Sequence, residues 1–465
     1  MRIMWVDDDW NEQSESRIIL CDLLEQLEAA LINKCQLAVS WELIASAGDA
    51  YTKIDDSESK YDFVIIDYEF KNAEGEIQEI SVDRLHKKLE ERCIYNLLLT
   101  NYVQNSRSRN NKYCFGAYEK SGQRFIEDIV YFFSCPPFRI IQISDIHYNS
   151  IENLDDQEQY IESLHNQLRK IQCEKNSDFL IIAGDLAASN PAVELSLMTS
   201  VLNYILMDTN IKKERILIVP GNHEIVWSDF KNNKRERSPY SSFVSFLQTF
   251  YTKESVYSQL VEQNIYNSGS LSVNCSEDDL TWLSRFPNLG VSIIGICSNS
   301  SELSEQGKGV LSQSNIRYIR DVWGEEKPSN ETRILVLHHN IFPTRSLFSE
   351  DEQRTIANAG TALDVLTSCG CDIVMSGHTH RAEILIYQSS VMDHNGYSEL
   401  DPPMIVLASG TSGGVSPTHD FPRNFNVVDI SRNIHTRSKR VHVNPHIYNS
   451  RNNSWRIGKG TSFEL

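Results

Sequence analysis

Six short apolar runs in the second part of the chain constrain its fold more than any other feature. They lie between residues 138 and 376 and read FRIIQIS, DFLIIA, RILIVP, VSIIGIC, RILVLH and CDIVMS. Continuous apolar runs of this length are typical of strands in parallel sheets that are buried on both faces. Because parallel strands end at the same edge of a sheet, the polar residues that follow the runs are expected to form an active site there.

The residues that follow these runs are of the types that bind transition metals. They are Asp145-Ile146-His147, Gly184-Asp185, Gly221-Asn222-His223-Glu224, His338-His339 and Gly377-His378-Thr379-His380. Carboxylates, imidazoles and amide oxygens bind zinc, manganese and iron, and this set can supply two divalent cations that share one anionic oxygen. Each glycine before a ligand is expected to allow a tight turn that exposes the next side chain.

In this order the motifs resemble those of the calcineurin-like metallophosphoesterases. That family has D-x-H, G-D, G-N-H-[DE], H and G-H-x-H, and residues 139–430 contain all five blocks without substitution. The resemblance implies a four-layer α/β/β/α fold, in which two packed sheets are flanked by helices. It also implies two metal sites that share Asp185, one completed by Asp145, His147 and His380, the other by Asn222, His338 and His378.

The resemblance also implies a reaction. Two cations of manganese, iron or zinc would lower the pKa of a bridging water, and the resulting hydroxide would attack phosphorus in line. His223 resembles the family's acid that protonates the leaving oxygen, and Glu224 could hold the His223 ring in the right tautomer. Arg381 could contact a substrate phosphate, or it could be an ordinary surface arginine.

Residues 1–133 alternate strands and helices in a separate pattern. The runs RIMWV, FVII and YNLLL read as strands, Cys114–Tyr118 as a weaker strand, and residues 16–33 and 81–92 as helices. This alternation predicts a doubly wound parallel sheet covered by helices, with its functional residues at the strand ends. The polar residues at those ends are Asp7, Asp8, Asp9, Asp67, Thr100 and Lys120.

The arrangement resembles the receiver domain of bacterial response regulators. The matching positions are the magnesium-binding acidic pair Asp7 and Asp8, the phosphoacceptor Asp67, the switch hydroxyl Thr100 and the phosphate-pairing lysine Lys120. Ser121 stands where the family usually has proline, and Tyr118 is one place from the usual switch aromatic. The resemblance implies a histidine kinase or another phosphodonor as a partner. A degenerate receiver that serves only docking or formation of a homodimer is the alternative.

A double proline gives the domain boundary. It ends the helix expected over residues 123–133, so we expect domains at 1–133 and 139–430, joined by a linker at 134–138. Aromatic residues over 225–286 predict either a cap insertion over the pocket or a helical insertion with its own core. Residues 431–465 hold seven Lys or Arg and one acid, and form either terminal strands of a sheet or a phosphate-attracting patch.

The composition narrows the possible partners. The 44 Lys or Arg residues against 63 Asp or Glu residues give a net charge of −19, which argues against a general nucleic-acid coat. The start MRIMWVDDDW lacks the apolar stretch of a signal peptide, and no apolar run approaches the roughly 20 residues of a membrane helix. With its scattered cysteines, the chain is expected to be cytoplasmic, without a membrane partner.

Together these features predict a two-domain enzyme that hydrolyses a phosphoester. A phosphodiester is the first choice of substrate, either a cyclic nucleotide or a nucleic acid, and phosphorylation of Asp67 is a possible regulator. A nuclease or phosphomonoesterase whose receiver serves only docking is one alternative. The other is a signalling adaptor that uses the phosphoesterase fold only for binding.

Overall fold

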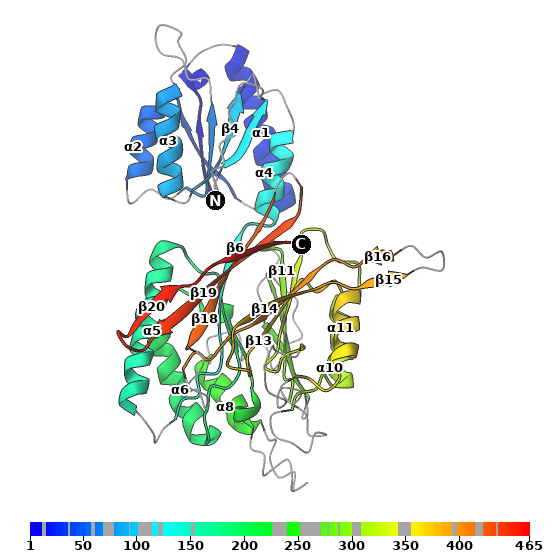
Figure 1. The fold of residues 1–465 in the computed structure, drawn as a ribbon. Helices are drawn as coiled ribbons and strands as arrows, with labels where there is room; N and C mark the ends of the chain where they lie inside the picture. Colours follow the sequence, from blue (N-terminus) through cyan, green and yellow to red (C-terminus); the bar gives the residue numbers. More distant parts are fainter. Residues whose placement is uncertain are drawn as a thin grey trace. The chain divides into compact units, whose positions relative to one another are not determined.

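The computed structural model divides into two compact units (Figure 1). One unit comprises Met1–Pro136 with Asn433–Arg437, and the other Pro137–Arg432 with Ser438–Leu465. The residues described are 1–11, 15–35, 38–56, 61–67, 79–92, 94–100, 114–119, 124–149, 154–225, 240–251, 271–276, 279–286, 289–299, 308–342, 355–392, 398–413, 422–433 and 436–465.

The first unit contains a five-stranded parallel sheet in the order β2-β1-β3-β4-β5. Its strands are β1 (Arg2–Val6), β2 (Ser40–Ile44), β3 (Phe63–Asp67), β4 (Tyr95–Thr100) and β5 (Cys114–Glu119). The sequence predicted four of the five strands. The edge strand β2 was missed because its sequence SWELI is half exposed and has no continuous apolar run.

Helices cover both faces of this sheet, as predicted. On one face α1 (Glu15–Cys35) and α4 (Arg124–Ser134) share a core with Trp5 and Ile65. On the other, α2 (Ala47–Asp55) and α3 (Glu79–Glu91) pack with Met4 and Val64. The strands β1 and β3 are therefore buried on both sides, and the acidic residues at their carboxyl ends meet at one edge of the sheet.

The second unit contains two seven-stranded sheets. The first runs β20-β19-β18-β6-β7-β8, with β21 also paired to β19, and the second runs β14-β17-β13-β12-β11-β10-β9. The six apolar runs of the sequence form β6 (Phe138–Ile143), β7 (Phe179–Ala183), β8 (Ile216–Val219), β11 (Val291–Ile296), β12 (Thr332–Val336) and β13 (Ile373–Ser376). Three of these strands therefore belong to each sheet, and within each sheet they are parallel.

The remaining strands extend the two sheets or form a separate hairpin. The first sheet adds β18 (Asn424–Arg432), β19 (Lys439–Asn449), β20 (Ser454–Ile457) and β21 (Thr461–Glu464). The second adds β9 (Leu271–Ser276), β10 (Asp279–Phe286), β14 (Glu383–Tyr387) and β17 (Met404–Ala408). The hairpin consists of β15 (Ser390–Met392) and β16 (Ser398–Leu400).

The two sheets pack against each other between helical layers (Figure 1). The helices α5 (Leu154–Glu174), α6 (Pro191–Leu206) and α8 (Ser241–Phe250) cover the first sheet, and α10 (Gln313–Trp323) and α11 (Ala359–Ser368) cover the second. In β13, Ile373 and Met375 join the core between the sheets, whereas Val374 joins the core under α10 and α11. Among the helices described, none is both long and apolar enough to cross a bilayer.

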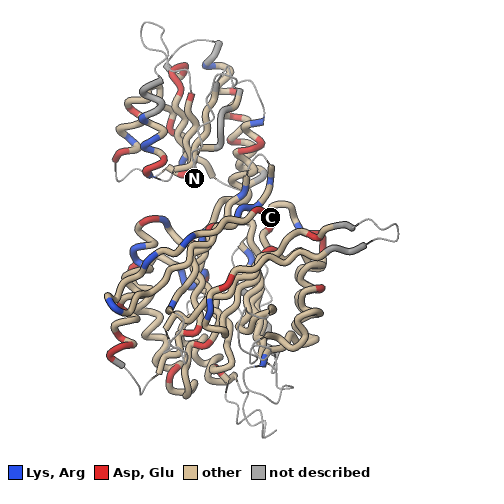
Figure 2. The backbone as a smooth tube through the Cα atoms, viewed as in Figure 1, with Lys and Arg blue, Asp and Glu red and all other residues tan. Residues whose placement is uncertain are grey.

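Two segments that the sequence left ambiguous form part of this unit. Of residues 225–286, the described part forms α8 and the β9–β10 hairpin, and Phe243, Phe246 and Phe250 are buried in the core. The C-terminal segment forms β19 to β21, as the interpretation as terminal strands predicted. Figure 2 shows Lys and Arg along β19 and β20.

Candidate metal centre

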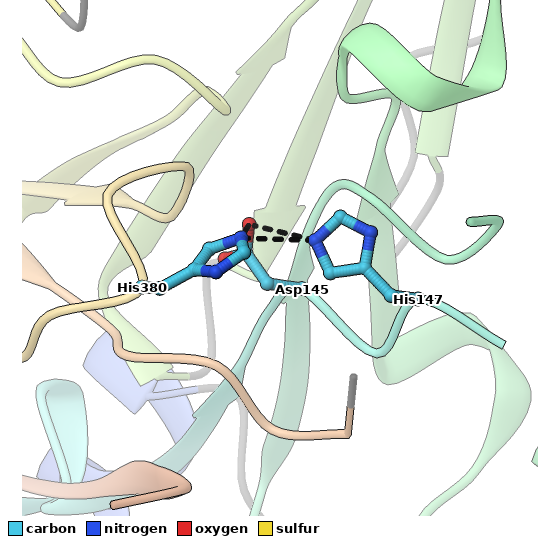
Figure 3. Close-up of side chains that lie close together, drawn as sticks. All are labelled: Asp145, His147 and His380. Carbon is cyan, nitrogen blue, oxygen red and sulfur yellow. Dashed lines mark hydrogen bonds and ion pairs between the residues drawn. The ribbon is translucent and has the colours of Figure 1, made fainter. Parts of the chain in front are cut away.

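The predicted ligands lie just beyond the carboxyl ends of β6, β7, β8, β12 and β13, where the two sheets bring them together. The structure contains three overlapping groups of such residues, and within each group the possible ligand atoms all lie within 4.8 Å of one another. The groups are Asp145-His147-His380, His147-Asp185-His223 and Asp185-His338-His378. Figure 3 shows the first group, in which both rings point toward the Asp145 carboxylate.

Most of these residues have an unusual backbone conformation. Five of the seven predicted ligands have positive φ angles between 47° and 71°, and they are Asp145, His147, Asp185, His378 and His380. Residues with a side chain rarely adopt this region, which costs of the order of 1 kcal/mol each and is concentrated at functional sites. The strain is therefore located where the sequence predicted the metal ligands.

The chemistry of the donor atoms fits divalent cations. The Nε2 atoms of His147 and His380 face each other at 2.9 Å, and Nδ1 of His378 lies 3.2 Å from Nε2 of His338. Facing imidazole nitrogens repel unless a proton or a cation lies between them. The centre also contains the fully buried Asp145 carboxylate, so a positive charge is required there.

The pKa shifts of the buried His and Asp side chains also indicate that positive charge is favoured in this centre. Burial alone would lower the pKa of His338, but the Asp185 carboxylate, 3.2 Å from its Nε2, together with the Asp145 charge and the Ala183 carbonyl raises that pKa to about 9. Burial would raise the pKa of Asp185, yet the rings of His338, His223 and His147 together hold it well below 3.8. For His147, burial dominates and lowers the pKa to about 4, which favours the neutral ring that metals require.

The three glycines that precede ligands act in two ways. Gly184 has φ +85°, so it provides the turn conformation that we expected. No positive φ occurs at Gly221 or Gly377, where the expected reason was wrong. A Cβ atom on Gly221 would lie 2.1 Å from Oδ1 of Asp185, so at this position glycine is required by close packing against the carboxylate.

Glu224 does not have the role that we expected. Its buried carboxylate accepts hydrogen bonds from the backbone amides of Asp185 (2.8 Å), Ala187 (2.9 Å) and Gly221 (2.7 Å). The assignment of Glu224 as the partner of the His223 ring is therefore corrected. Glu224 instead joins the G-D turn to the G-N-H-E turn, and burial together with the Asp185 charge raises its pKa to about 7.

The His223 ring is oriented by a backbone group. Its Nδ1 donates to the carbonyl oxygen of Ala188, and its backbone amide donates to Oδ1 of Asp185 at 3.0 Å. Because a carbonyl can only accept, Nδ1 carries the proton, and Nε2 is the nitrogen left for chemistry. That Nε2 lies 4.0 Å from Oδ2 of Asp185, and the ring edge contacts the His147 ring.

The remaining predicted residues have identifiable partners. Asn222 is buried, with its side-chain oxygen 3.1 Å from Nε2 of His338. Nε of Arg381 pairs with Glu383 at 3.1 Å, which favours the ordinary surface role over a phosphate contact. Sequence reasoning missed a support behind the ligands, in which Ser298 bonds the buried His339 ring, and that ring packs on His378.

The N-terminal acidic cluster is also brought together. Carboxylate oxygens of Asp7, Asp8 and Asp67 lie within 4.8 Å of one another, and Asp7 and Asp67 are buried. Of the other expected pocket residues, the side chain of Thr100 and the whole of Lys120 lie outside the described residues. Of the predicted pocket residues, the structure thus brings together the three carboxylates.

Comparison with known proteins assigns the second unit. The family model for calcineurin-like phosphoesterases matches residues 138–382, more than half of the chain and all five motif blocks. The chain belongs to the calcineurin-like phosphoesterase family. Membership implies a dinuclear divalent-metal site, and the Asp and His groups described above could hold the ions. The match does not extend into the N-terminal unit.

Individual relatives are distant. The uncharacterized metallophosphoesterase-like protein YydB of Bacillus subtilis (strain 168) is 26% identical over 213 residues, covering 44% of this chain and 42% of the relative. The chain thus spans less than half of that protein. Among solved structures, GAP50 of Plasmodium has a TM-score of 0.34 at 12% identity, covering 71% of this chain and 89% of GAP50. A putative 5′-nucleotidase from Staphylococcus aureus has a TM-score of 0.32 at 14% identity, covering 70% and 54%.

Proposed function

We propose that the chain is a metal-dependent phosphoester hydrolase with a phosphodiester as its substrate. The observation that carries this proposal is the set of three overlapping ligand groups at the ends of strands from both sheets. Family membership supports hydrolysis of a phosphoester. The preference for a diester, either a cyclic nucleotide or a nucleic acid, rests on the resemblance, because bacterial members of the family that begin with D-x-H often cleave diesters.

We assign the proposed ligands to two ions. The buried carboxylate of Asp185 is shared by both ions, and each other ligand belongs to one of them. The first ion would be held by Asp145, His147, Asp185 and His380, and the second by Asp185, Asn222, His338 and His378. When bound, two such cations of manganese, iron or zinc supply Lewis acidity for activating water and polarising phosphoryl oxygens.

The chain's own groups supply orientation and a proton. In the protonated ring of His223, Nδ1 stays bonded to the Ala188 carbonyl, so Nε2 can donate to the oxygen of the leaving group. The His223 side chain is 32% exposed, so part of the side chain can be reached from solvent. Glu224 acts indirectly, because its bonds to backbone amides fix the turns that carry Asp185 and His223.

The test is a metal-loaded assay on four substrate types. Manganese-, iron- and zinc-loaded protein is assayed on an aryl phosphodiester, the matching monoester, cyclic nucleotides and single-stranded DNA. We expect hydrolysis of a diester above that of the monoester, and loss of all activity in Asp145→Ala. Hydrolysis of the monoester alone would contradict the diester preference. Protein that purifies without stoichiometric metal and remains inactive after metal is added would support a binding adaptor.

A second candidate function concerns the N-terminal unit. The 2-1-3-4-5 parallel sheet and the cluster of Asp7, Asp8 and Asp67 favour a receiver-like magnesium pocket, in which Asp67 accepts a phosphoryl group from a histidine kinase or another phosphodonor. The modified unit would then raise or lower hydrolysis. The test compares turnover with and without beryllofluoride and magnesium, in wild type and in Asp67→Ala. Equal rates throughout would contradict regulation.

A further inference from the structure

We infer that Glu194, on the first turn of α6, is a positioning residue that sets the ring orientation of His223 through the Ala188 carbonyl. This inference rests on the proposed function, in which His223 donates the proton. Glu194 is fully buried, although it lies in the first turn of a helix whose other face is partly exposed. A buried carboxylate must be compensated by hydrogen bonds, and here these bonds go to one short turn.

The Glu194 carboxylate binds three consecutive backbone amides. Its Oε2 accepts from the amides of Ala188, Ser189 and Asn190, each at 2.9 Å, and its Oε1 accepts from the hydroxyl of Ser189 at 3.3 Å. Charge-assisted bonds of this kind are stronger than neutral ones. They fix the turn between β7 and α6 in a single conformation.

The same turn provides the partner of His223. The Ala188 amide points to Glu194 while the Ala188 carbonyl accepts from Nδ1 of His223. The Glu194 carboxylate therefore acts on the His223 ring through the backbone of Ala188. It fixes the direction of the Ala188 carbonyl, and that carbonyl selects the Nδ1–H tautomer of the ring. Without Glu194, the amides of Ser189 and Asn190 lose this acceptor, and the Ala188 amide keeps only its bond to the Tyr148 carbonyl at 3.2 Å. The Ser189 amide belongs to the same peptide plane as the Ala188 carbonyl, so that carbonyl loses the bond that fixes its direction toward the ring.

A role limited to starting α6 is the competing explanation. The residue at the N-cap position, Asn190, makes no side-chain capping bond, so Glu194 also contributes to the helix start. The control for this role is Leu195→Ala. Leu195 is the next residue on the same helix, 1% exposed, and its apolar side chain packs into the core and cannot accept hydrogen bonds from the amides of the turn.

The first measurement is the tautomer of His223 in metal-free protein. Nitrogen-15 NMR of the histidine rings, with His223→Ala for assignment, is recorded for wild type, Glu194→Ala, Glu194→Gln and Leu195→Ala. We expect the Nδ1–H form in wild type and in Leu195→Ala, a mixture of tautomers in Glu194→Ala, and partial retention in Glu194→Gln, which keeps one acceptor oxygen. An unchanged Nδ1–H form in Glu194→Ala would overturn the inference.

The second measurement is the dependence of kcat on the leaving group. A proton donor matters for an alkoxide and little for a nitrophenolate, so Glu194→Ala should lose about 10-fold more activity on an alkyl ester than on the nitrophenyl ester. Glu194→Ala combined with His223→Ala should be no slower than His223→Ala alone, because the two residues act as one unit. An equal loss on both esters, as expected for Leu195→Ala, or additive losses would overturn the inference.

The two measurements separate this inference from the proposed function. If no loaded form of the wild type hydrolyses any phosphoester, the proposed function fails and the tautomer measurement still decides the role of Glu194. If hydrolysis occurs and the tautomer does not depend on Glu194, only the inference about Glu194 fails.

Discussion

The acidic cluster of the N-terminal unit and the metal centre of the phosphoesterase unit are built by the same topology with different ligands. Both lie at the carboxyl ends of parallel strands, where side chains from separate strands meet. Among the described residues, the first brings together the carboxylates of Asp7, Asp8 and Asp67, and the second combines two carboxylates with imidazoles and an amide. Topology thus locates a candidate site, whereas the types of ligand determine which cation it would select.

The two sites also differ in how their backbone is held. In the phosphoesterase unit, a single buried carboxylate, Glu224, accepts hydrogen bonds from three backbone amides in two ligand turns. In the N-terminal unit, the Asp7 carboxylate accepts from the amide of Asp9 at 3.1 Å. The metal centre is therefore supported by residues that are not themselves ligands, as expected for a preorganised site.

Removal of metals gives the largest expected effect and tests the difference in ligand chemistry. Chelation should abolish hydrolysis, and manganese should restore it where magnesium alone does not, because imidazole ligands favour borderline cations. Metal content is measured by mass spectrometry alongside activity. Full activity with magnesium alone would show that the two sites do not differ in selectivity.

Substitution of the shared carboxylate is the next largest effect. We expect Asp185→Asn to lower kcat at least about 10³-fold, the scale seen when a group that acts in the transition state is removed. Asp67→Asn should leave the unstimulated kcat unchanged and should alter only the response to beryllofluoride. Comparable losses of unstimulated kcat in both variants would contradict the separation of the two sites.

The comparison extends to ion pairs that stabilise each unit. In the phosphoesterase unit, Arg139 contacts both oxygens of Asp429 at 2.9 Å, and Lys175 adds a contact at 3.0 Å. All three side chains are at most 24% exposed, so Asp429→Asn should lower the free energy of unfolding by about 3 kcal/mol at pH 7. Denaturant unfolding measures the difference.

The same pair predicts a pH dependence. Burial opposes ionisation of Asp429, but the bonds and charges of Arg139 and Lys175 together outweigh burial and lower the pKa from 3.8 to about 2. Since the folded-state pKa is the lower one, this stabilisation is present above pH 3.8 and is lost as the pH falls through 2. The gap between wild type and Asp429→Asn should therefore close over that interval, and a constant gap would contradict the assignment.

The smallest effect is expected at the corresponding pair in the N-terminal unit. Glu42 accepts from Arg2 at 2.6 Å and from the Tyr61 hydroxyl at 2.7 Å, and it also pairs with Lys53. Both cationic side chains are more than 40% exposed. We expect Glu42→Gln to cost no more than about 1 kcal/mol, because water screens exposed pairs. A loss as large as that of Asp429→Asn would remove this difference between the units.

The sequence predicted the parts of the structure that depend on strong local patterns. Continuous apolar runs identified strands such as β7 and β12, and the residue types after them identified side chains that do converge. The alternation in residues 1–133 predicted a doubly wound sheet, but it missed α2, whose 9 residues are too few for a long helical repeat of apolar positions. The pattern of side-chain types along the sequence thus predicted the strands and the side chains that converge at their ends.

What the sequence could not predict are interactions of side chains with backbone. Glu224 was expected to contact a ring because its neighbour is a histidine, and its real partners are amides that no residue type reveals. Glu194 carries no motif signal, since its effect passes through the carbonyl of an alanine. The need for glycine at Gly221 depends on a carboxylate that approaches from another turn.

The positive φ angles of the five proposed ligands have a consequence for mutational tolerance. At Asp185, for example, glycine would relieve backbone strain, so the substitution that best suits the backbone is also one that removes a ligand. Stability and metal binding are therefore opposed at the same positions, as in other sites where function is maintained at a cost in stability. A selection for thermal resistance alone, without a demand for hydrolysis, would be expected to erode this metal centre first.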